Sequence, residues 1–404
     1  MVVVGGGAAG FFAAIACAEA RPGVSVTILE KSPTFLAKVR ISGGGRCNVT
    51  HHCFEPRELT SHYPRGERAL IAPFHQFQAR DTVQWFADRG VVLKTESDGR
   101  MFPTTDSSET IVSCLLQAAR SAGISLRPNA GVEAIERTAD GAFRATLSTG
   151  EGLRCDRLLL ATGGCRSAAL GQLAVSLGHH LEPPVPSLFT FHVPVPWLRA
   201  LSGVSLEDAE LSVPGAGLRE RGPLLLTHWG LSGPAVLRLS AWGARWLHDC
   251  GYTFRLLVNW LPKLNPEQLM QQFESRRQNS PAKYLVNTPI PPLSARLWEQ
   301  LVLAAGLAAT ARWSEVSKSD LVRLSQHLSR MELNVQGKSL NKDEFVTCGG
   351  VSLKEVNFKT MESRVCPGLY FAGEILDIDG ITGGFNFQAA WTTGWIAGRS
   401  MAGI

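Results

Sequence analysis

Three glycines near the start of the chain have the spacing of a dinucleotide-binding site. Gly5, Gly7 and Gly10 directly follow the β-branched run 2–4, and the Ala-rich segment 8–20 behind them favours a helix. In this pattern the first glycine permits a tight turn, the second lets a pyrophosphate approach the backbone, and the third lets helix and strand pack closely. The unpaired N–H groups at the start of the helix would bind the phosphates.

An acidic residue lies where this pattern requires one. A second apolar strand, within residues 24–29, ends at Glu30, which is 20 residues after Gly10. Its carboxylate can accept hydrogen bonds from a ribose diol and would repel a 2′-phosphate. The adenosine would therefore belong to FAD or NAD rather than to NADP. An ordinary glycine turn is the alternative, but strand, helix, spacing and acid together disfavour it.

A second glycine cluster, residues 43–45, lies in the segment 31–52, which we expect to be a long loop. Another close approach of backbone to a ligand would explain it, and a flexible surface loop is the alternative. Polar residues flank the cluster and favour ligand contact: Ser42, Arg46, Cys47 and Asn48.

Nucleotide-binding chemistry is also indicated further along the chain. An apolar strand of the buried parallel type runs into Ala161-Thr162-Gly163-Gly164, and Gly163 would lie near the cofactor. After a buried strand at 369–372, Glu374 is placed to bind a ribityl chain; a solvated turn acid is the alternative. The helix expected from about 386 to 397 would point its N-terminus at a flavin and stabilise negative charge on it. Only FAD needs both of these features, which favours FAD over NAD.

The order of the predicted elements indicates an α/β protein with an insertion. We expect a Rossmann-type FAD-binding domain in two parts, residues 1–182 and 346–404. Short β-like runs divided by Pro and Gly predict an inserted β-barrel-like subdomain at 183–262. Segments with helical apolar spacing predict a helical subdomain with a return strand at 263–345.

Composition narrows the class of protein. The chain has 404 residues, 45% of them hydrophobic, a formal net charge of +5 and nine cysteines. The cysteines are odd in number and contain no C-x-x-C pair, which indicates reduced thiols, a cytoplasmic location and no disulfide-reductase chemistry. The uncharged segment 2–18 contains four glycines and no basic flank, so we expect neither a signal peptide nor a membrane span. The oligomeric state stays open.

The chain resembles the BaiN-like flavoproteins, also called the aminoacetone oxidase family. The resemblance rests on GGGAAG, ISGGGRCNVT, GRMFP, LLLATGG, THWGLSGPAVL and GLYFAGEILDIDGITGGFNFQAAW, in that order. It covers nearly the whole chain and implies non-covalent FAD in a nucleotide-binding domain interrupted by a barrel and helices.

Matched motif by motif, the resemblance implies three groups of cofactor-binding residues. The ADP half would be held by Gly5, Gly7, Ala8, Ala9, Gly10, Glu30 and Lys31, with Ala161, Thr162 and Gly163 nearby. The flavin side would be lined by Lys38, Ser42, Gly43, Gly44, Arg46, Cys47 and Asn48. The ribityl chain and the ring would be surrounded by Gly373, Glu374, Asp377, Gly384, Asn386 and Phe387.

For the reaction, the resemblance implies hydride transfer from flavin N5 to an activated C=C bond of an enone or ring in a small molecule. Only one complete glycine fingerprint is present, so a nicotinamide donor, NAD(P)H, would dock transiently. His228, on a turn before a helix start, is the leading proton donor, although a turn histidine bonded to backbone is as plausible. Cys47 is a second catalytic candidate, with a small buried filler as its alternative.

Two other functions stay open at this point. One is an RNA-modifying flavoprotein that reduces uridine in ribosomal RNA, for which the basic charge is weak support. The other is a flavin oxidase that acts on a small amine with oxygen as acceptor. The pair at 51–52 has no companion ligands at metal spacing, so we expect no metal site.

Overall fold

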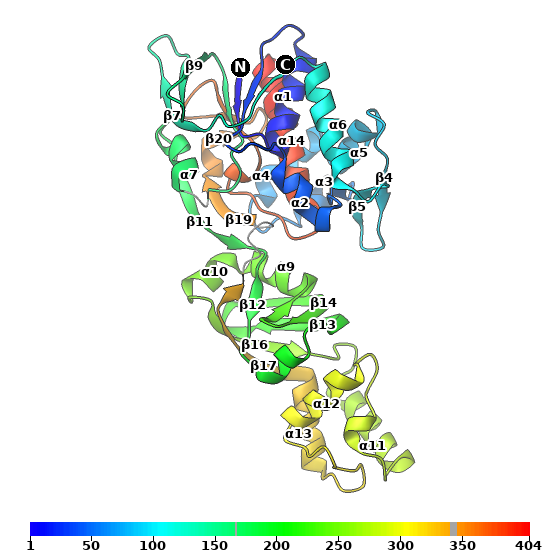
Figure 1. Cartoon of the computed structure of the whole chain (residues 1–404). Helices are drawn as coiled ribbons and strands as arrows, with labels where there is room; N and C mark the ends of the chain where they lie inside the picture. The colour runs from blue at the N-terminus through cyan, green and yellow to red at the C-terminus, as the bar shows by residue number, and fades with distance from the viewer. Residues whose placement is uncertain (166–167, 340–345) are drawn as a thin grey trace. The chain divides into compact units, whose positions relative to one another are not determined.

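The computed structural model describes residues 1–165, 168–339 and 346–404 and divides the chain into two compact units (Figure 1). The first unit consists of residues 1–187 with 342–404, and the second of residues 188–341. The second unit is thus an insertion in the first, as the sequence predicts.

The first unit is built on a seven-stranded sheet with the order β20-β21-β22-β10-β1-β2-β6. Five neighbouring strands are parallel: β1 (Val2–Val4), β2 (Thr27–Leu29), β6 (Ser125–Arg127), β10 (Leu158–Leu160) and β22 (Leu369–Phe371). The chain winds outward from β1 through β2 to β6, and β10 and β22 lie on the other side of β1. The strand order therefore switches between β1 and β10, and in such sheets ligands bind at the carboxyl ends of the strands beside the switch.

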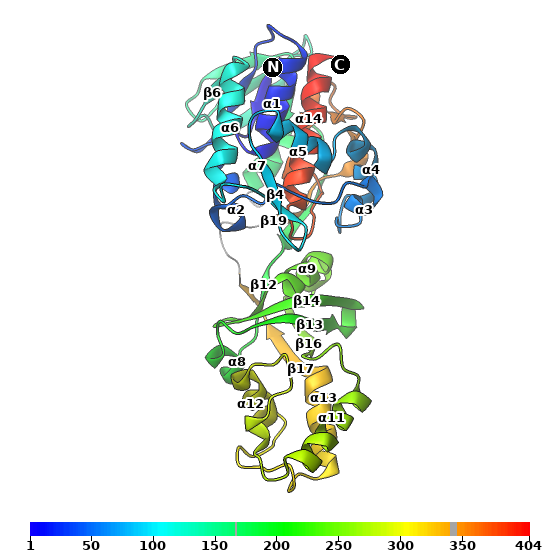
Figure 2. The ribbon, with the colours of Figure 1, turned by 90° about the vertical axis from the view of Figure 1, so that its right-hand side faces the viewer.

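Two glycine-bearing helices pack against each other beside this sheet. Helix α1 (Ala8–Ala20) follows β1, and α14 (Phe385–Ala402) is the last helix of the chain. A β-carbon on Gly394 would lie 2.5 Å from the carbonyl oxygen of Ala9, so only glycine allows this approach. Both views show the two helices side by side (Figures 1 and 2). The first and last helices of the chain therefore form one layer.

Smaller elements complete the first unit. The segment 31–52, expected to be a loop, contains the short helix α2 (Ala37–Gly45), which has non-helical dihedral angles from Ser42 to Gly44. The helices that follow are α3 (Pro56–Thr60), α4 (Glu67–Gln76), α5 (Ala79–Ala87), α6 (Ser108–Ser121) and α7 (Ala168–Val175). The other strands are β3 (Thr50–His51), β4 (Leu93–Thr95), β5 (Arg100–Pro103), β7 (Val132–Arg137), β8 (Phe143–Leu147), β9 (Gly152–Cys155), β20 (Val356–Asn357) and β21 (Glu362–Ser363). Strands β7, β8 and β9 form an antiparallel meander.

The boundary of the insertion differs from the prediction at residue 182. Strand β11 (Leu181–Ser187) pairs with β19 (Val346–Val351) and so belongs to the first unit, which ends at Ser187. The prolines at 183, 184 and 186 suggested the start of the inserted subdomain, but a strand with one neighbour tolerates Pro at an irregularity. The register shifts between Glu182 and Val185, within this proline-rich stretch.

The second unit contains the expected barrel. Its antiparallel sheet has the order β17-β16-β13-β14-β15-β12-β18. Only Gly337 separates β17 from β18, so one kinked strand pairs with β16 on one side and with β12 on the other and closes the sheet. Its strands are β12 (Thr190–His192), β13 (Ser205–Val213), β14 (Leu218–Thr227), β15 (Gly230–Ser232), β16 (Thr253–Asn259), β17 (Met331–Gln336) and β18 (Lys338–Ser339).

The helices of the insertion do not form a separate unit, in contrast to the predicted division at residue 262. They are α8 (Pro196–Ala200), α9 (Pro234–Trp242), α10 (Ala244–Asp249), α11 (Pro266–Asn279), α12 (Ala295–Ala304) and α13 (Lys318–Arg330). Buried side chains of barrel and helices, such as Leu256 and Leu324, belong to one hydrophobic core. The connection from β16 to β17 carries α11 to α13, so the helical segment begins and ends in the barrel.

Among the described residues, no helix is long and apolar enough to cross a membrane. The nine cysteines all lie in the described ranges, none of them forms a disulfide, and seven are buried.

Candidate functional site

The carboxyl ends of β1, β2, β10 and β22 bring the separate glycine motifs to one edge. The N–H of Gly5 donates to Leu29 at 2.8 Å, and that of Ala161 donates to Val4 at 2.8 Å. A β-carbon on Gly10 would lie 2.0 Å from the Gly5 carbonyl oxygen, so helix and strand do pack closely there. A β-carbon on Gly7 would meet no atom within 4 Å. This open space beside the N-terminus of α1, where Ala8 and Ala9 begin the helix, fits a pyrophosphate.

Glu30 lies beside this glycine turn at the end of β2. Its Oε2 accepts a hydrogen bond of 2.9 Å from the Gly6 N–H. Its Oε1 accepts from the N–H and the hydroxyl of Ser32 at 2.9 and 2.8 Å. A carboxylate has further lone pairs, so these bonds orient Glu30 and still leave it able to accept from a ribose diol. Lys31 follows it with an exposed side chain.

A second polar group lies across the strand switch, where β10 and β22 end. Glu374 is bound by the Thr347 N–H at 2.9 Å and by the Lys38 ammonium group. A β-carbon on Gly163 would lie 4.0 Å from Glu374, so the glycine turn after β10 reaches this carboxylate. The Thr162 hydroxyl is buried without a hydrogen-bond partner among the described residues. An unsatisfied buried hydroxyl beside the open glycine turn fits a ligand rich in oxygen atoms.

The loop from Ser42 to Asn48 has an unusual backbone. Gly43, Gly44 and Gly45 all have positive φ angles, between 58° and 84°, and so does Cys47, at 62°. Nothing lies within 4 Å of a β-carbon built on Gly44 or Gly45, so the backbone is open to a ligand there. Cys47 is fully buried, and burial raises the pKa of its thiol to about 12. Its thiol therefore stays protonated at neutral pH and behaves as a small buried side chain.

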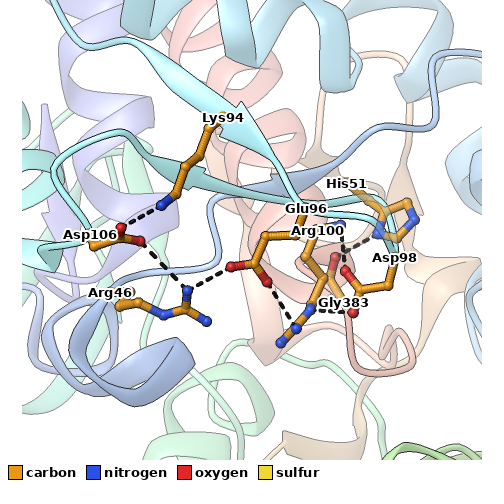
Figure 3. Close-up of polar contacts among 8 residues, drawn as sticks. All are labelled: Arg46, His51, Lys94, Glu96, Asp98, Arg100, Asp106 and Gly383. Carbon is orange, nitrogen blue, oxygen red and sulfur yellow. Dashed lines mark hydrogen bonds and ion pairs between the residues drawn. The ribbon is translucent and has the colours of Figure 1, made fainter. Parts of the chain in front are cut away.

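Arg46 is held by Glu96, in the turn of the hairpin β4–β5, and by Asp106, just after β5 (Figure 3). Its guanidinium lies 2.6 Å from Glu96 and 3.6 Å from Asp106, and it covers the ring of Phe102 at 4.0 Å. Glu96 also pairs with Arg100, as Figure 3 shows. The hydrogen bond to Glu96 is the main cause that raises the pKa of Arg46. Arg46 was expected to line the flavin side, and the structure places its charge on the hairpin that supports the loop.

The N-terminus of α14 closes the same region. In the amide orientation that satisfies both of its groups, Asn48 accepts from the Gly384 N–H and donates to the Thr50 carbonyl, both at 3.0 Å. Asn386 bonds both backbone groups of Gly380, at 2.8 and 2.9 Å, and Phe387 stacks on Trp391 at 5.5 Å. Asn386 and Phe387 therefore shape the loop and the helix start, and the first N–H groups of α14 are the groups available to an anionic ring.

Two features near this helix were missed from the sequence. His51 bonds the Gly383 carbonyl at 3.0 Å (Figure 3). Its ring also stacks on that of Phe385 at 4.7 Å, and burial lowers its pKa. The fully buried Asp379 pairs with Arg65 and accepts a hydrogen bond of 2.7 Å from the Ser187 hydroxyl. The only signals in the sequence were the run His51-His52 and the position of Asp379 within the C-terminal glycine motif.

The remaining predicted residues have separate positions. Gly373 lies at the start of a 3-10 turn at 373–375, and Asp377 is half-buried with its N–H bonded to Val351 at 3.2 Å. His228 lies exposed on the turn between β14 and β15 in the second unit, with its ring 4.7 Å from that of Trp229. Within the described ranges no group of three or more His, Cys, Asp or Glu residues could hold a metal.

Known proteins resemble this chain over nearly its whole length. A family model described as the HI0933-like protein Rossmann domain matches residues 1–400. A 3-dehydro-bile acid delta(4,6)-reductase of Clostridium scindens is 30% identical, with 99% of this chain and 98% of the relative covered. A ribosomal RNA dihydrouridine synthase of Escherichia coli is also 30% identical, with 99% and 97% covered.

Solved structures show the same fold at low sequence identity. A 3-ketosteroid delta1-dehydrogenase from Sterolibacterium denitrificans gives a TM-score of 0.52 at 14% identity and covers 100% of this chain and 99% of its own. A 3-ketosteroid-delta4-(5alpha)-dehydrogenase from Rhodococcus jostii gives 0.51 at 15% identity, with 99% and 96% covered. At these identities the likeness extends to the fold alone.

Proposed function

The chain belongs to the HI0933-like Rossmann family, and from that premise we propose that it reduces a C=C bond conjugated to a carbonyl group. Its class, an FAD-dependent oxidoreductase, follows from the family. The direction of the reaction and the kind of bond are the proposal.

One observation carries this proposal. The two relatives that match over 99% of the chain have names that describe the same chemistry on unrelated substrates. The first name denotes reduction of double bonds in a 3-oxo steroid, and the second denotes a uridine to which two hydrogens have been added. Both reactions place a hydride on an electron-poor carbon, so a shared active-site chemistry with different substrate surfaces explains both names.

The residues of the first unit suit this chemistry. When bound, FAD supplies a hydride and takes on negative charge as it is reduced. The N-terminus of α14, held in place by Asn48, would stabilise that charge through its free N–H groups. Glu374, oriented by Thr347 and Lys38, would bind the ribityl chain, and Glu30 would bind the adenosine ribose.

Proton delivery is assigned to His228 rather than to Cys47. A thiol with a pKa of about 12 is a poor acid at neutral pH, and Cys47 is fully buried. His228 is exposed and belongs to the insertion, which would provide the surface that selects the substrate. His228→Ala is expected to slow product formation while flavin reduction by the donor is unchanged.

We assign the electron supply to NAD(P)H that docks transiently. The glycines at 215 and 217 belong to a short 3-10 turn in the barrel, not to a strand–turn–helix unit. Among the described residues this leaves the β1–α1 turn as the dinucleotide site with that architecture, and FAD would occupy it. The nicotinamide would therefore have to reach the flavin without a dedicated domain.

The test is an anaerobic experiment on the FAD-loaded protein. NADPH or NADH is added, flavin reduction is followed by absorbance, and a steroid enone is then mixed in. The proposal expects the enone to reoxidise the flavin and to gain two hydrogens. The proposal fails if the enone does not reoxidise the flavin and if, once air is admitted, the reduced flavin reacts with oxygen to give peroxide and the enzyme oxidises a small amine.

A second candidate, reduction of uridine in ribosomal RNA, is favoured by the distribution of charge. Residues 188–341 contain 16 Lys and Arg against 11 Asp and Glu, a net charge of +5. The rest of the chain contains 24 of each and is neutral. The whole net positive charge therefore lies on the insertion, and a polyanionic substrate would be attracted there.

Salt dependence distinguishes the two candidates. If RNA is the substrate, affinity for a ribosomal RNA fragment should fall steeply between low and moderate salt, because released counterions drive the binding. If a small enone is the substrate, RNA affinity should be weak at all salt concentrations and turnover of the enone should be retained. Conversion of uridine to dihydrouridine in isolated RNA would support the second candidate function.

A further inference from the structure

Thr347 carries a polar group for which the described residues offer no partner. Its side chain is fully buried on β19, and its hydroxyl makes no hydrogen bond with any described residue. A buried hydroxyl without a partner costs about 1–3 kcal/mol, so it is seldom kept without a use. Valine has nearly the same shape and would fill this position without that cost.

The surroundings of Thr347 are those of the cofactor site. Its own N–H donates to Glu374 Oε1 at 2.9 Å. A β-carbon on Gly164 would lie 2.4 Å from the Thr347 hydroxyl oxygen and 2.9 Å from Glu374 Oε1. Hydroxyl and carboxylate thus face the same glycine, and Thr162, two residues before it, has a second buried hydroxyl without a described partner.

This set of groups has the chemistry of a polyol site. A carboxylate accepts hydrogen bonds from hydroxyls, a threonine hydroxyl both donates and accepts, and the Lys38 ammonium group donates. A ligand that satisfies all of them needs several neighbouring hydroxyls. The ribityl chain of FAD has three of them in a row, between the flavin ring and the pyrophosphate.

We propose that Thr347 is a ligand of the ribityl chain of FAD: its hydroxyl bonds a ribityl hydroxyl, and its N–H holds Glu374 in position for the next. The strand that returns from the insertion thereby contributes to the cofactor site. This inference depends on FAD binding and not on the proposed substrate, so the two can fail independently.

The central experiment compares Thr347→Val with Thr347→Ser. Valine removes the hydroxyl and keeps the shape, and we expect its affinity for FAD to fall about three- to tenfold, the range for one neutral hydrogen bond. Serine keeps the hydroxyl and should bind FAD nearly as the parent does. FAD affinity is measured by titrating the apoprotein, prepared by removing FAD from the holoprotein, and following flavin fluorescence.

The stability of the apoprotein shows whether the Thr347 hydroxyl acts as a ligand of FAD or as a structural group. Because the hydroxyl is unsatisfied in the chain itself, Thr347→Val apoprotein should unfold at the same or a higher denaturant concentration than the parent. Thr82→Val is the matched control, since that buried hydroxyl lies 3.0 Å from Gln388 Oε1. This control should lose stability and keep its affinity for FAD.

ADP identifies which part of FAD is contacted. Thr347→Val should bind ADP as the parent does, because ADP carries no ribityl chain. If Thr347→Val binds FAD as tightly as the parent, the proposal is wrong. It is equally wrong if FAD and ADP affinity fall together with apoprotein stability, since the hydroxyl would then act through the fold.

Discussion

A β-carbon placed on Gly398 would lie 2.2 Å from the carbonyl oxygen of Ala13. These residues belong to α14 and α1, so the helix that carries the ring end of the cofactor site lies directly against the helix that carries its phosphate end. Gly394 repeats the contact one turn earlier, at Ala9. The two ends of the site are therefore fixed relative to each other by helix–helix packing, although they are far apart in the sequence.

This contact predicts a large effect from one methyl group. Gly398→Ala should destabilise the protein by about 1–3 kcal/mol, because the added carbon forces the two backbones apart. Gly152→Ala is the control, since its β-carbon would meet no atom within 4 Å. Denaturant unfolding measures both. Equal stability of the two variants would contradict the packing described here.

Breaking the buried ion pair of Asp379 and Arg65 should cause an even larger loss of stability. Asp379→Asn should cost about 3–5 kcal/mol, because it leaves the mostly buried Arg65 guanidinium without its carboxylate. Asp140→Asn removes the carboxylate from the exposed pair with Arg154 and should change the free energy of unfolding far less, because water screens that pair. If both variants lose the same free energy of unfolding, burial does not make the pair of Asp379 and Arg65 more important for stability than the exposed pair.

The hairpin that holds Arg46 predicts an indirect effect on FAD. Glu96→Gln weakens the support of the glycine loop, so FAD affinity should fall by about two- to fivefold, in line with a partly exposed ion pair. The difference should shrink at high salt, which screens the pair in the parent protein. Glu151→Gln breaks the exposed pair with Arg127 and should leave FAD affinity unchanged. A salt-independent loss would point to direct contact instead.

His51 predicts a dependence of stability on pH. Burial lowers its pKa below the ordinary value of 6.5, and the charged or titratable groups that act on it are His62, His52 and Asp98. As the pH falls through 6.5, the unfolded chain takes up a proton that folded His51 resists, so stability is lost. His51→Asn should reduce the loss of stability between about pH 7.5 and about pH 5.5. An unchanged loss would mean that His51 titrates alike in both states.

Local patterns in the sequence were sufficient for the inner strands β1, β10 and β22 of the central sheet. The runs at 2–4, 158–160 and 369–371 are wholly apolar, as strands buried on both faces require, and each precedes a glycine turn. The glycine spacing after the first run predicted α1, and a helix was expected from about 386 to 397, within α14. These features are local, so propensity and burial decide them without knowledge of the rest of the chain.

Long-range contacts determine the features that local sequence patterns did not predict. The pairing of β11 with β19 joins residues more than 150 positions apart and overrides the boundary signal of Pro183 and Pro184. Arg46 donates a hydrogen bond to Glu96, a residue 50 positions further along the chain, and no local pattern predicts this contact. Thr347 has a weak signal, the glycine pair that follows it at 349–350, but only the fold shows that its hydroxyl lies beside Glu374.

Titration of the apoprotein with FAD tests the central claim, a cofactor site at the carboxyl ends of β1 and β10, most directly when parent, Gly7→Ala and Gly152→Ala are compared. Neither alanine meets an atom within 4 Å in the chain itself, so all three should unfold at the same denaturant concentration. The parent and Gly152→Ala should each bind one FAD per chain, whereas Gly7→Ala should bind none, because its methyl group occupies the space of the pyrophosphate. A Gly7→Ala protein that binds FAD as tightly as the parent would contradict the account.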